Sequence, residues 1–326
     1  MIVLSANEVA ELLPMTDAIQ IVRKAMIGVS NHEANLPLRH VVEVGGVNKL
    51  GIMPGVLKDG GTYGVKLLSL FPENPAKGLS SHTGAMVLFD PETGAPNAMM
   101  SADALTAIRT AAASAAATDA LAREDSHTLA IIGTGEQAES HVAAMCEIRD
   151  ISEVRVAGRD QIKANAFIER ICADFPQITF SAAKDAQSAV KDVDIVCTTT
   201  SAAKPIMFGD WLVPGCHVNA VGASLPIVQE IDQSVLTVSE VFVDYRPSAF
   251  AQAREIIDAL ENGTITKSDI LAEIGEVFSG AHPGRSGANA ITLYRSLGVA
   301  SQDLASAEFV MDQAIKRGVG IAASVT

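Results

Sequence analysis

Hydrophobic residues in the second half of the chain occur in short runs that alternate with segments of helical period. The run at residues 129–132 is followed directly by the turn Gly133-Thr134-Gly135-Glu136-Gln137-Ala138 and then by a helical pattern. Similar apolar runs recur at residues 154–156, 179–180, 194–198, 217–221 and 241–243. Runs of this kind are typical of strands buried on both faces. Their alternation with helices predicts a Rossmann-type, doubly wound parallel sheet.

The first part of the chain has a different pattern, in which apolar positions alternate with polar ones. Segments at residues 41–44, 50–54, 63–68 and 86–90, with Gly-Gly and Asp-Gly turns among them, indicate an antiparallel meander. A strand and an amphipathic helix capped by Ser5 are expected before the meander, and an alanine-rich helix at residues 102–121 after it. A last helix, at residues 305–316, is expected to return to this part.

These patterns predict an α/β protein with two domains. An α+β domain is expected at residues 1–122 and 300–326. A dinucleotide-binding domain with the doubly wound parallel sheet is expected at residues 123–299. A chain of 326 residues is long enough for two such cores.

The turn after residues 129–132 has the G-x-G-x-x-A spacing of a dinucleotide-binding loop. The first glycine makes the tight turn, the second lets the backbone approach a pyrophosphate, and the small third residue lets the helix pack closely. The helix N-terminus presents N–H groups and its dipole to the anion. We assign five residues to cofactor binding: Gly133, Thr134, Gly135, Glu136 and Gln137. A glycine turn without a ligand is the alternative interpretation.

The residues that follow the apolar run at 154–156 indicate which dinucleotide binds. An acid there takes the ribose hydroxyls of NAD, but this chain has Ala157, Gly158 and Arg159. An arginine at this place can stack on adenine and pair with the 2′-phosphate of NADP. We therefore expect NADPH, held by residues 157–159, with NADH possible because Asp160 follows. A solvated surface charge is the alternative interpretation of Arg159.

Composition excludes several functional classes. A net charge of -14 argues against nucleic-acid binding, and no apolar stretch or signal pattern indicates a membrane span or export. The four cysteines are scattered without a C-x-x-C pair, which favours a cytoplasmic protein and gives no metal site. We expect all four to be small buried apolar residues: Cys146, Cys172, Cys197 and Cys216.

Arg109 is the one cation in the middle of the alanine-rich helix. Few charges on this helix would face water, so the helix is expected to be buried. A buried arginine needs an anion partner. Arg109 is therefore either half of a structural ion pair or a clamp for an anionic ligand.

Several separate motifs, at residues 81–94, 108–118, 131–138 and 217–224, resemble the ornithine cyclodeaminase/mu-crystallin family over nearly the whole chain. The resemblance implies that the α+β domain binds the substrate and forms the contact of a homodimer. It also implies hydride transfer at the α-carbon of an amino or imino acid. Members of the family include ornithine and lysine cyclodeaminases, alanine dehydrogenases and reductases of cyclic ketimines.

By this resemblance Arg39, Lys66 and Arg109 fall on the positions that bind the substrate carboxylate, through charge-assisted hydrogen bonds. Lys66 and Arg109 are the expected catalytic residues, with Lys66 able to protonate near the imine if burial lowers its pKa. An Arg109 that points outward or pairs with an internal acid would contradict this hypothesis. His82 and Thr83 resemble positions that line the nicotinamide side, with a structural hydrogen-bonding role as the alternative for His82. The other expected cofactor-binding residues are Thr199, Val221 and Ser224, and Ser224 is also expected to bind the substrate.

Ser224 decides the expected subclass. Cyclodeaminases and archaeal alanine dehydrogenases have an aspartate there, and ring closure needs a base that serine cannot supply at neutral pH. A second carboxylate of the cyclodeaminases aligns near Gly51, which has nothing to ionise. We therefore expect reduction of a small anionic imino acid, Δ1-pyrroline-2-carboxylate or Δ1-piperideine-2-carboxylate, to L-proline or L-pipecolate. An ornithine cyclodeaminase or alanine dehydrogenase-like enzyme, or an NADPH-dependent binding protein, are the alternatives.

Overall fold

The computed structural model describes residues 1–324 and divides the chain into two compact units. The first unit comprises Met1–Thr110 and Val299–Thr326, and the second comprises Ala111–Gly298. The sequence places the divisions at residues 122/123 and 299/300. The first division instead falls inside helix α3 (Ala102–Leu121), because the alanine-rich second half of this helix packs within the second unit.

The first unit contains a seven-stranded sheet in the order β15-β1-β6-β5-β4-β3-β2. The expected antiparallel meander is confirmed, since each strand from β2 to β6 pairs with the next. Strands β6 and β15 are additions that the sequence pattern does not predict. The strands are β1 (Ile2–Leu4), β2 (His40–Gly45), β3 (Asn48–Val56), β4 (Tyr63–Leu70), β5 (His82–Phe89), β6 (Pro96–Ser101) and β15 (Ile321–Ala322).

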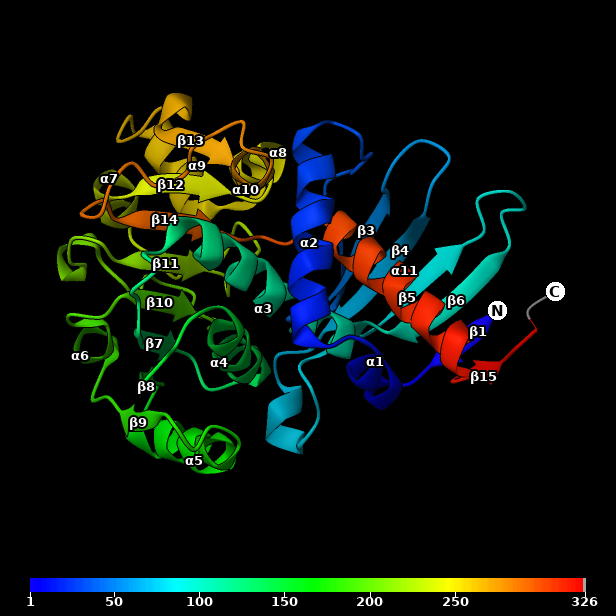
Figure 1. The fold of residues 1–326 in the computed structure, drawn as a ribbon, viewed down its shortest axis with the longest axis horizontal. Helices are drawn as coiled ribbons and strands as arrows, with labels where there is room; N and C mark the ends of the chain where they lie inside the picture. Colours follow the sequence, from blue (N-terminus) through cyan, green and yellow to red (C-terminus); the bar gives the residue numbers. More distant parts are fainter. Residues whose placement is uncertain (325–326) are drawn as a thin grey trace. The chain divides into compact units, whose positions relative to one another are not determined.

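Helices α1 (Ala6–Leu12), α2 (Met15–Ser30) and α11 (Ala300–Arg317) belong to the first unit, with a short 3-10 helix at Asn74–Lys77. Ser5 caps α1 as expected, in a capping box in which its N–H donates to Glu8 Oε2 at 2.7 Å. One amphipathic helix is expected up to residue 30, but Pro14 divides it into two. Helix α11 returns to this unit as expected, packing on α2 and on strands β3, β4 and β5 (Figure 1).

The second unit contains an eight-stranded sheet in the order β13-β12-β14-β11-β10-β7-β8-β9, and all its pairings are parallel. The expected doubly wound sheet is confirmed, and β7 lies at its switch point, between β8 and β10. The pattern does not predict β13 and β14. The strands are β7 (Thr128–Ile132), β8 (Glu153–Ala157), β9 (Thr179–Ala182), β10 (Ile195–Thr198), β11 (His217–Ala220), β12 (Glu240–Val243), β13 (Ile270–Glu273) and β14 (Thr292–Arg295).

Helices cover both faces of this sheet. Figure 1 shows the second half of α3 and helix α4 on one face and α6 and α7 on the other. Ser114 Oγ and His141 Nε2, 2.9 Å apart and fully buried, join α3 to α4. The helices are α4 (Glu136–Ile148), α5 (Gln161–Ile171), α6 (Ala186–Val190), α7 (Gln233–Val238), α8 (Arg246–Gln252), α9 (Arg254–Glu261) and α10 (Ile274–Phe278), with 3-10 turns at Cys172–Asp174, Gly209–Trp211 and Lys267–Asp269.

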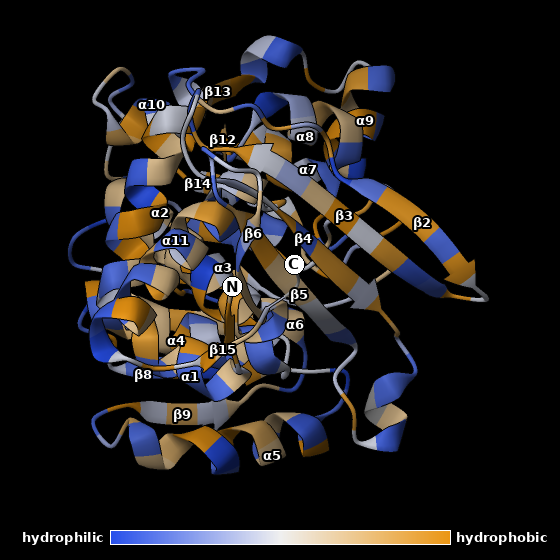
Figure 2. Ribbon diagram, turned by 90° about the vertical axis from the view of Figure 1, so that its right-hand side faces the viewer, coloured by the Kyte–Doolittle hydropathy of each residue, from blue (hydrophilic) through white to orange (hydrophobic). Residues whose placement is uncertain are grey.

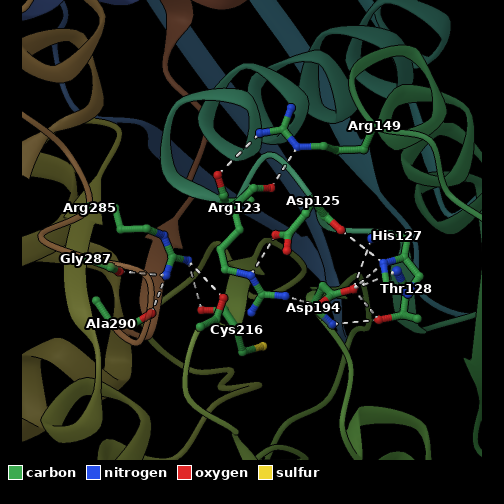
Figure 3. A network of polar contacts seen from close by, with 12 residues as sticks. Arg123, Asp125, His127, Thr128, Arg149, Asp194, Cys216, Arg285, Gly287 and Ala290 are labelled. Atoms are coloured by element: carbon green, nitrogen blue, oxygen red, sulfur yellow. Dashed lines mark hydrogen bonds and ion pairs between the residues drawn. The ribbon is translucent and has the colours of Figure 1, made fainter.

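Charged side chains close the amino-terminal edge of the second sheet (Figure 3). The Asp194 carboxylate, just before β10, accepts from Arg123 Nη2 at 2.5 Å and from Thr128 Oγ1 at 2.7 Å. Arg285 donates through Nη2 to the carbonyl oxygen of Cys216 at 3.4 Å. This edge is therefore occupied by structural pairs, and the carboxyl edge is the one that a parallel sheet offers to a ligand.

The four cysteines are free. Cys197 and Cys216 are buried and Cys146 is half-buried, but Cys172, at the end of α5, is exposed. The expectation that all four are buried is wrong for Cys172, because the 3-10 turn that it begins has no buried residue. Among residues 1–324, no helix combines the length and the apolar composition that crossing a membrane requires.

Candidate functional site

The glycine turn lies at the carboxyl end of β7, between Ile132 and the start of α4. Gly133 has φ +137°, and a Cβ there would lie 2.5 Å from Thr199 Oγ1, so this position accepts glycine alone. Gly135 is the N-cap of α4, and a Cβ built on it meets nothing within 4 Å. Ala138 is fully buried against the sheet. The turn thus has a tight first glycine, an open space at the second, and a small third residue, which fits a dinucleotide pyrophosphate.

The expected ribose-binding segment follows β8. Ala157 pairs with Ile132 of β7, and a Cβ on Gly158 would lie 3.0 Å from Thr134 Cγ2, so this segment lies beside the glycine turn. The Asp160 carboxylate caps α5, accepting from the N–H of Lys163 at 2.8 Å. Arg159 is exposed and forms no ion pair within the described residues. The acid is therefore engaged by a helix, and the arginine is available to a phosphate.

Thr199, Val221 and Ser224 lie on the segments that leave β10 and β11. The Thr199 N–H donates to the Ile132 carbonyl at 2.8 Å, and the Val221 N–H donates to the Thr198 carbonyl at 3.1 Å. These segments are at the carboxyl edge, next to the switch point at β7. The expected cofactor residues of the second unit thus gather at one edge of one sheet.

The first unit contains a buried cluster of two cations and one acid. Lys66 of β4 and Arg109 of α3 both donate to Asp303 Oδ1 of α11, at 2.7 Å from Nζ and 2.8 Å from Nε. Arg109 Nη1 also donates to Gln302 Oε1 at 2.9 Å. Lys66 is 1% exposed, Arg109 4% and Asp303 0%. We call Lys66, Arg109 and Asp303 the charge cluster.

The pairing of Arg109 with Asp303 narrows the sequence hypothesis from the whole guanidinium group to one of its nitrogens. An internal acid partner counts against substrate binding by the full guanidinium group, and Asp303 is such a partner. Two guanidinium nitrogens are held by α11, whereas Nη2 makes no hydrogen bond within residues 1–324. Arg109 is therefore half of an ion pair, and a ligand has Nη2 rather than the whole guanidinium fork to bind.

Sequence reasoning missed Asp303. Two buried cations require a nearby anion, and this requirement was the available signal. The last helix was expected to begin at residue 305, so Asp303 was left outside it, whereas α11 begins at Ala300. Its side chain therefore lies on the helix face that packs against β3, β4 and β5.

The environment changes the proton affinity of the charge cluster. Burial lowers the pKa of Lys66 to about 7, with further lowering by the charges of Arg109 and Arg39 and partial opposition from Asp303. Burial raises the pKa of Asp303, but Arg109 and Lys66 outweigh this effect, so its net pKa is lowered. The pKa of His82 is lowered by desolvation and then by the charge of Lys66. Lys66 can therefore gain or lose a proton near neutral pH.

The structure brings Lys66, Arg109 and Arg39 close together, but not every residue expected near the substrate joins them. Lys66 and Arg109 share an oxygen of Asp303, and Arg39 is near enough to act on the pKa of Lys66. Thr83 of β5 is exposed and pairs with Ser69 rather than with Lys66. No three His, Cys, Asp or Glu side chains gather as metal ligands in the described part of the chain.

The chain is similar to known proteins over nearly its whole length. The family profile described as "Ornithine cyclodeaminase/mu-crystallin family" matches residues 1–318. A Δ1-pyrroline-2-carboxylate reductase of Bacillus cereus is 35% identical over 324 residues, covering 98% of each chain.

Solved structures show the same fold. A Δ1-pyrroline-2-carboxylate reductase of Thermococcus litoralis, in complex with NADH and L-proline, has a TM-score of 0.95 and 34% identity, covering 99% of this chain and 100% of its own. An archaeal alanine dehydrogenase dimer with bound NAD has a TM-score of 0.93 and 33% identity, covering 100% and 99%.

Proposed function

Since the chain belongs to the ornithine cyclodeaminase/mu-crystallin family, we propose that it is an NAD(P)H-dependent reductase of small cyclic imino acids. Δ1-Pyrroline-2-carboxylate, giving L-proline, is the first substrate to test, and Δ1-piperideine-2-carboxylate, giving L-pipecolate, is the second. The relatives named for the first reaction, and the one solved with NADH and L-proline, support this order.

The charge cluster is the observation that carries the proposal. Two cations and one carboxylate leave one positive charge in a buried place, which favours a ligand with one carboxylate. Arg109 Nη2 and Lys66 are the groups that would bind it, with Arg39 adding positive charge nearby. A nucleic acid or a membrane surface would not match a charge so deeply buried.

Reduction of a C=N bond needs a hydride at carbon and a proton at nitrogen. The reduced nicotinamide supplies the hydride when it is bound. A protonated imine already accepts hydride readily, so fixed position and fixed charge supply much of the rate. Lys66, with its pKa near neutrality, would hold the proton close to the imine nitrogen. Ser224 would bind on the nitrogen side without acting as a base.

We propose NADPH as the preferred cofactor, with NADH also accepted. The exposed Arg159, which follows β8, supports the form that carries the 2′-phosphate. The relatives solved with NADH and with NAD support use of the form without the 2′-phosphate. A ratio of kcat/KM for the two cofactors tests this directly.

We propose a homodimer that works in the cytoplasm. The alanine dehydrogenase relative is described as a dimer. Figure 2 shows hydrophobic residues along the edge strand β2, where Val42, Val44 and Val47 (in the turn that follows) are 40%, 56% and 57% exposed. Such an edge needs a partner or a cover. Four free cysteines fit a reducing compartment.

An alanine dehydrogenase-like activity is the second candidate, supported by the relative at 33% identity. Absorbance of the reduced cofactor separates the candidates. The cyclic imines should be reduced without ammonia, whereas a dehydrogenase would need pyruvate with ammonia, and a cyclodeaminase would act on ornithine with NAD. Cofactor binding without turnover of any of these would make the chain a binding protein and overturn the proposal.

A further inference from the structure

One buried carboxylate joins the two segments that leave β10 and β11. Glu230, which is 2% exposed, accepts through Oε1 from the Thr200 N–H at 2.5 Å. Its Oε2 accepts from Thr198 Oγ1 at 2.9 Å. The same oxygen accepts from the N–H groups of Gly222 at 2.6 Å and Ala223 at 3.3 Å. The Glu230 carboxylate therefore links the end of β10 and the segment after it to the segment that follows β11.

Arg295, at the end of β14, binds carbonyl oxygens at the end of β11 and in the segment that follows it. Arg295 donates to the carbonyl oxygens of Ala220, at 3.2 Å, and Ala223, and it pairs with the buried Glu255 of α9. A Cβ on Gly222 would lie 2.0 Å from the Thr200 carbonyl oxygen and 2.5 Å from Glu230 Oε1. The backbone at residues 220–223 is thus packed so closely that position 222 accepts no side chain.

Each partner of Glu230 is a donor, so the site requires a carboxylate. A glutamine has one acceptor oxygen, and its amide group would face at least one backbone N–H. Burial raises the pKa of Glu230, while these hydrogen bonds and the charge of Arg295 oppose that effect. None of these contacts reaches a candidate substrate residue of the first unit.

The two segments lie where a doubly wound sheet binds the half of the cofactor beyond the pyrophosphate, next to the switch point. They also carry Thr199, Val221 and Ser224. We propose that Glu230 is a positioning residue that fixes these two segments as a preformed wall for the nicotinamide half of the cofactor. The inference rests on the proposed use of a nicotinamide cofactor and is independent of the imino acid.

A preformed wall has a measurable consequence. In Glu230→Gln at least one backbone N–H that Glu230 binds is left unpaired, so the segments after β10 and β11 become less ordered in the free protein. Cofactor binding must then order these segments again. NADH should bind about tenfold more weakly, which is the scale of one unpaired buried amide. ADP-ribose, which lacks the nicotinamide, should bind within about twofold of the parent, since the glycine turn is unchanged.

The measurement is a fluorescence titration with NADH and a calorimetric titration with ADP-ribose, both without substrate. Glu273→Gln is the matched control, because Glu273 is 4% exposed, accepts from the Arg246 N–H at 2.9 Å, and ends β13, which lies three strands away from β11 in the sheet. The control should lose a similar amount of thermal stability while keeping its affinity for NADH.

If Glu230→Gln does not fold, Thr198→Val removes one donor and should weaken NADH by about threefold while sparing ADP-ribose. Unchanged NADH binding, or parallel losses for NADH and ADP-ribose, would overturn the inference. Both titrations are made without substrate. A failure of the proposed imine reduction would therefore not change their outcome, and the two proposals can fail separately.

Discussion

Asp303 and Lys66 form a buried ion pair, with Asp303 Oδ1 2.7 Å from Lys66 Nζ, and the same oxygen accepts from Arg109. One atom of α11 therefore joins β4 to α3. Asp303 Oδ2 has no hydrogen-bond partner within the described residues. A single acid thus fixes the positions of both cations and also influences the proton on Lys66.

Asp303→Asn should shift the pH profile toward acid. If protonated Lys66 is the active form, kcat/KM is full below its pKa and is lost as the pH rises through about 7. Removing the carboxylate removes an attraction that raises this pKa, so the loss should begin about one pH unit lower. Arg39, Arg109 and His82 are the other charged or titratable groups nearby, and they are retained.

The check is a profile of kcat/KM with a cyclic imine, compared with Glu308→Gln as the control. Glu308 lies on the same helix and accepts from Thr62 instead. A profile for Asp303→Asn that superimposes on the parent would refute a protonated Lys66 in the reaction.

Arg109→Ala should reduce kcat/KM for the cyclic imine by about 100-fold, on the scale of a lost buried charge partner. Gln302→Leu, which removes one acceptor of Arg109 but no charge, should lose about tenfold or less. Steady-state rates at saturating cofactor give both values. Parent-like turnover by Arg109→Ala would mean that this arginine has a structural role alone.

Arg159→Ala should remove a preference for NADPH. Loss of one charge-assisted contact with the 2′-phosphate should raise the KM for NADPH about tenfold and leave that for NADH unchanged. Arg170→Ala is the control, since Arg170 is an exposed arginine on α5 that pairs with Glu139. Equal cofactor selectivity in the parent and Arg159→Ala would remove Arg159 from the site.

The two glycines of the turn should respond differently to alanine. Gly133→Ala forces a Cβ to 2.5 Å from Thr199 Oγ1 at φ +137°, so it should lower the free energy of unfolding by about 2 kcal/mol or more. Gly135→Ala meets no atom within 4 Å and should leave the melting temperature nearly unchanged. It should nevertheless weaken NADH binding about tenfold or more, because the methyl group occupies the space for the pyrophosphate. Melting curves and NADH titrations separate the two effects, and full NADH affinity in Gly135→Ala would place the pyrophosphate elsewhere.

The sequence predicts most of the fold because local pattern dictates it. The apolar runs before and after the glycine turn become β7 to β12, and the alternating segments become the meander. Strands β13 and β14 are not predicted, because Glu273 ends β13, and Thr292 and Arg295 bound β14, so neither strand is an uninterrupted apolar run. Pro14 marks the break between α1 and α2, but the amphipathic pattern continues across it and by itself predicts one helix.

The site is less predictable, because its decisive contacts join distant positions. Lys66 and Asp303 are 237 residues apart, and no local pattern connects them. Glu230 lies in a loop without a motif of its own, and its donors are mostly backbone N–H groups that come together only in the folded chain. The glycine turn, by contrast, is a local motif, and its spacing alone identifies the cofactor edge of the sheet.

The return of α11 to the first unit affects how the protein is made. Ribosomes deliver the two cations of the charge cluster long before the acid that pairs with them, because Lys66 and Arg109 precede Asp303 by about two-thirds of the chain. Until the final helix emerges, a nascent first unit has no counter-charge for these side chains and must keep them in contact with water. A truncated product that ends before Val299 would lack α11 and β15. It would therefore lack a native first unit, although it contains the other six strands of the first sheet.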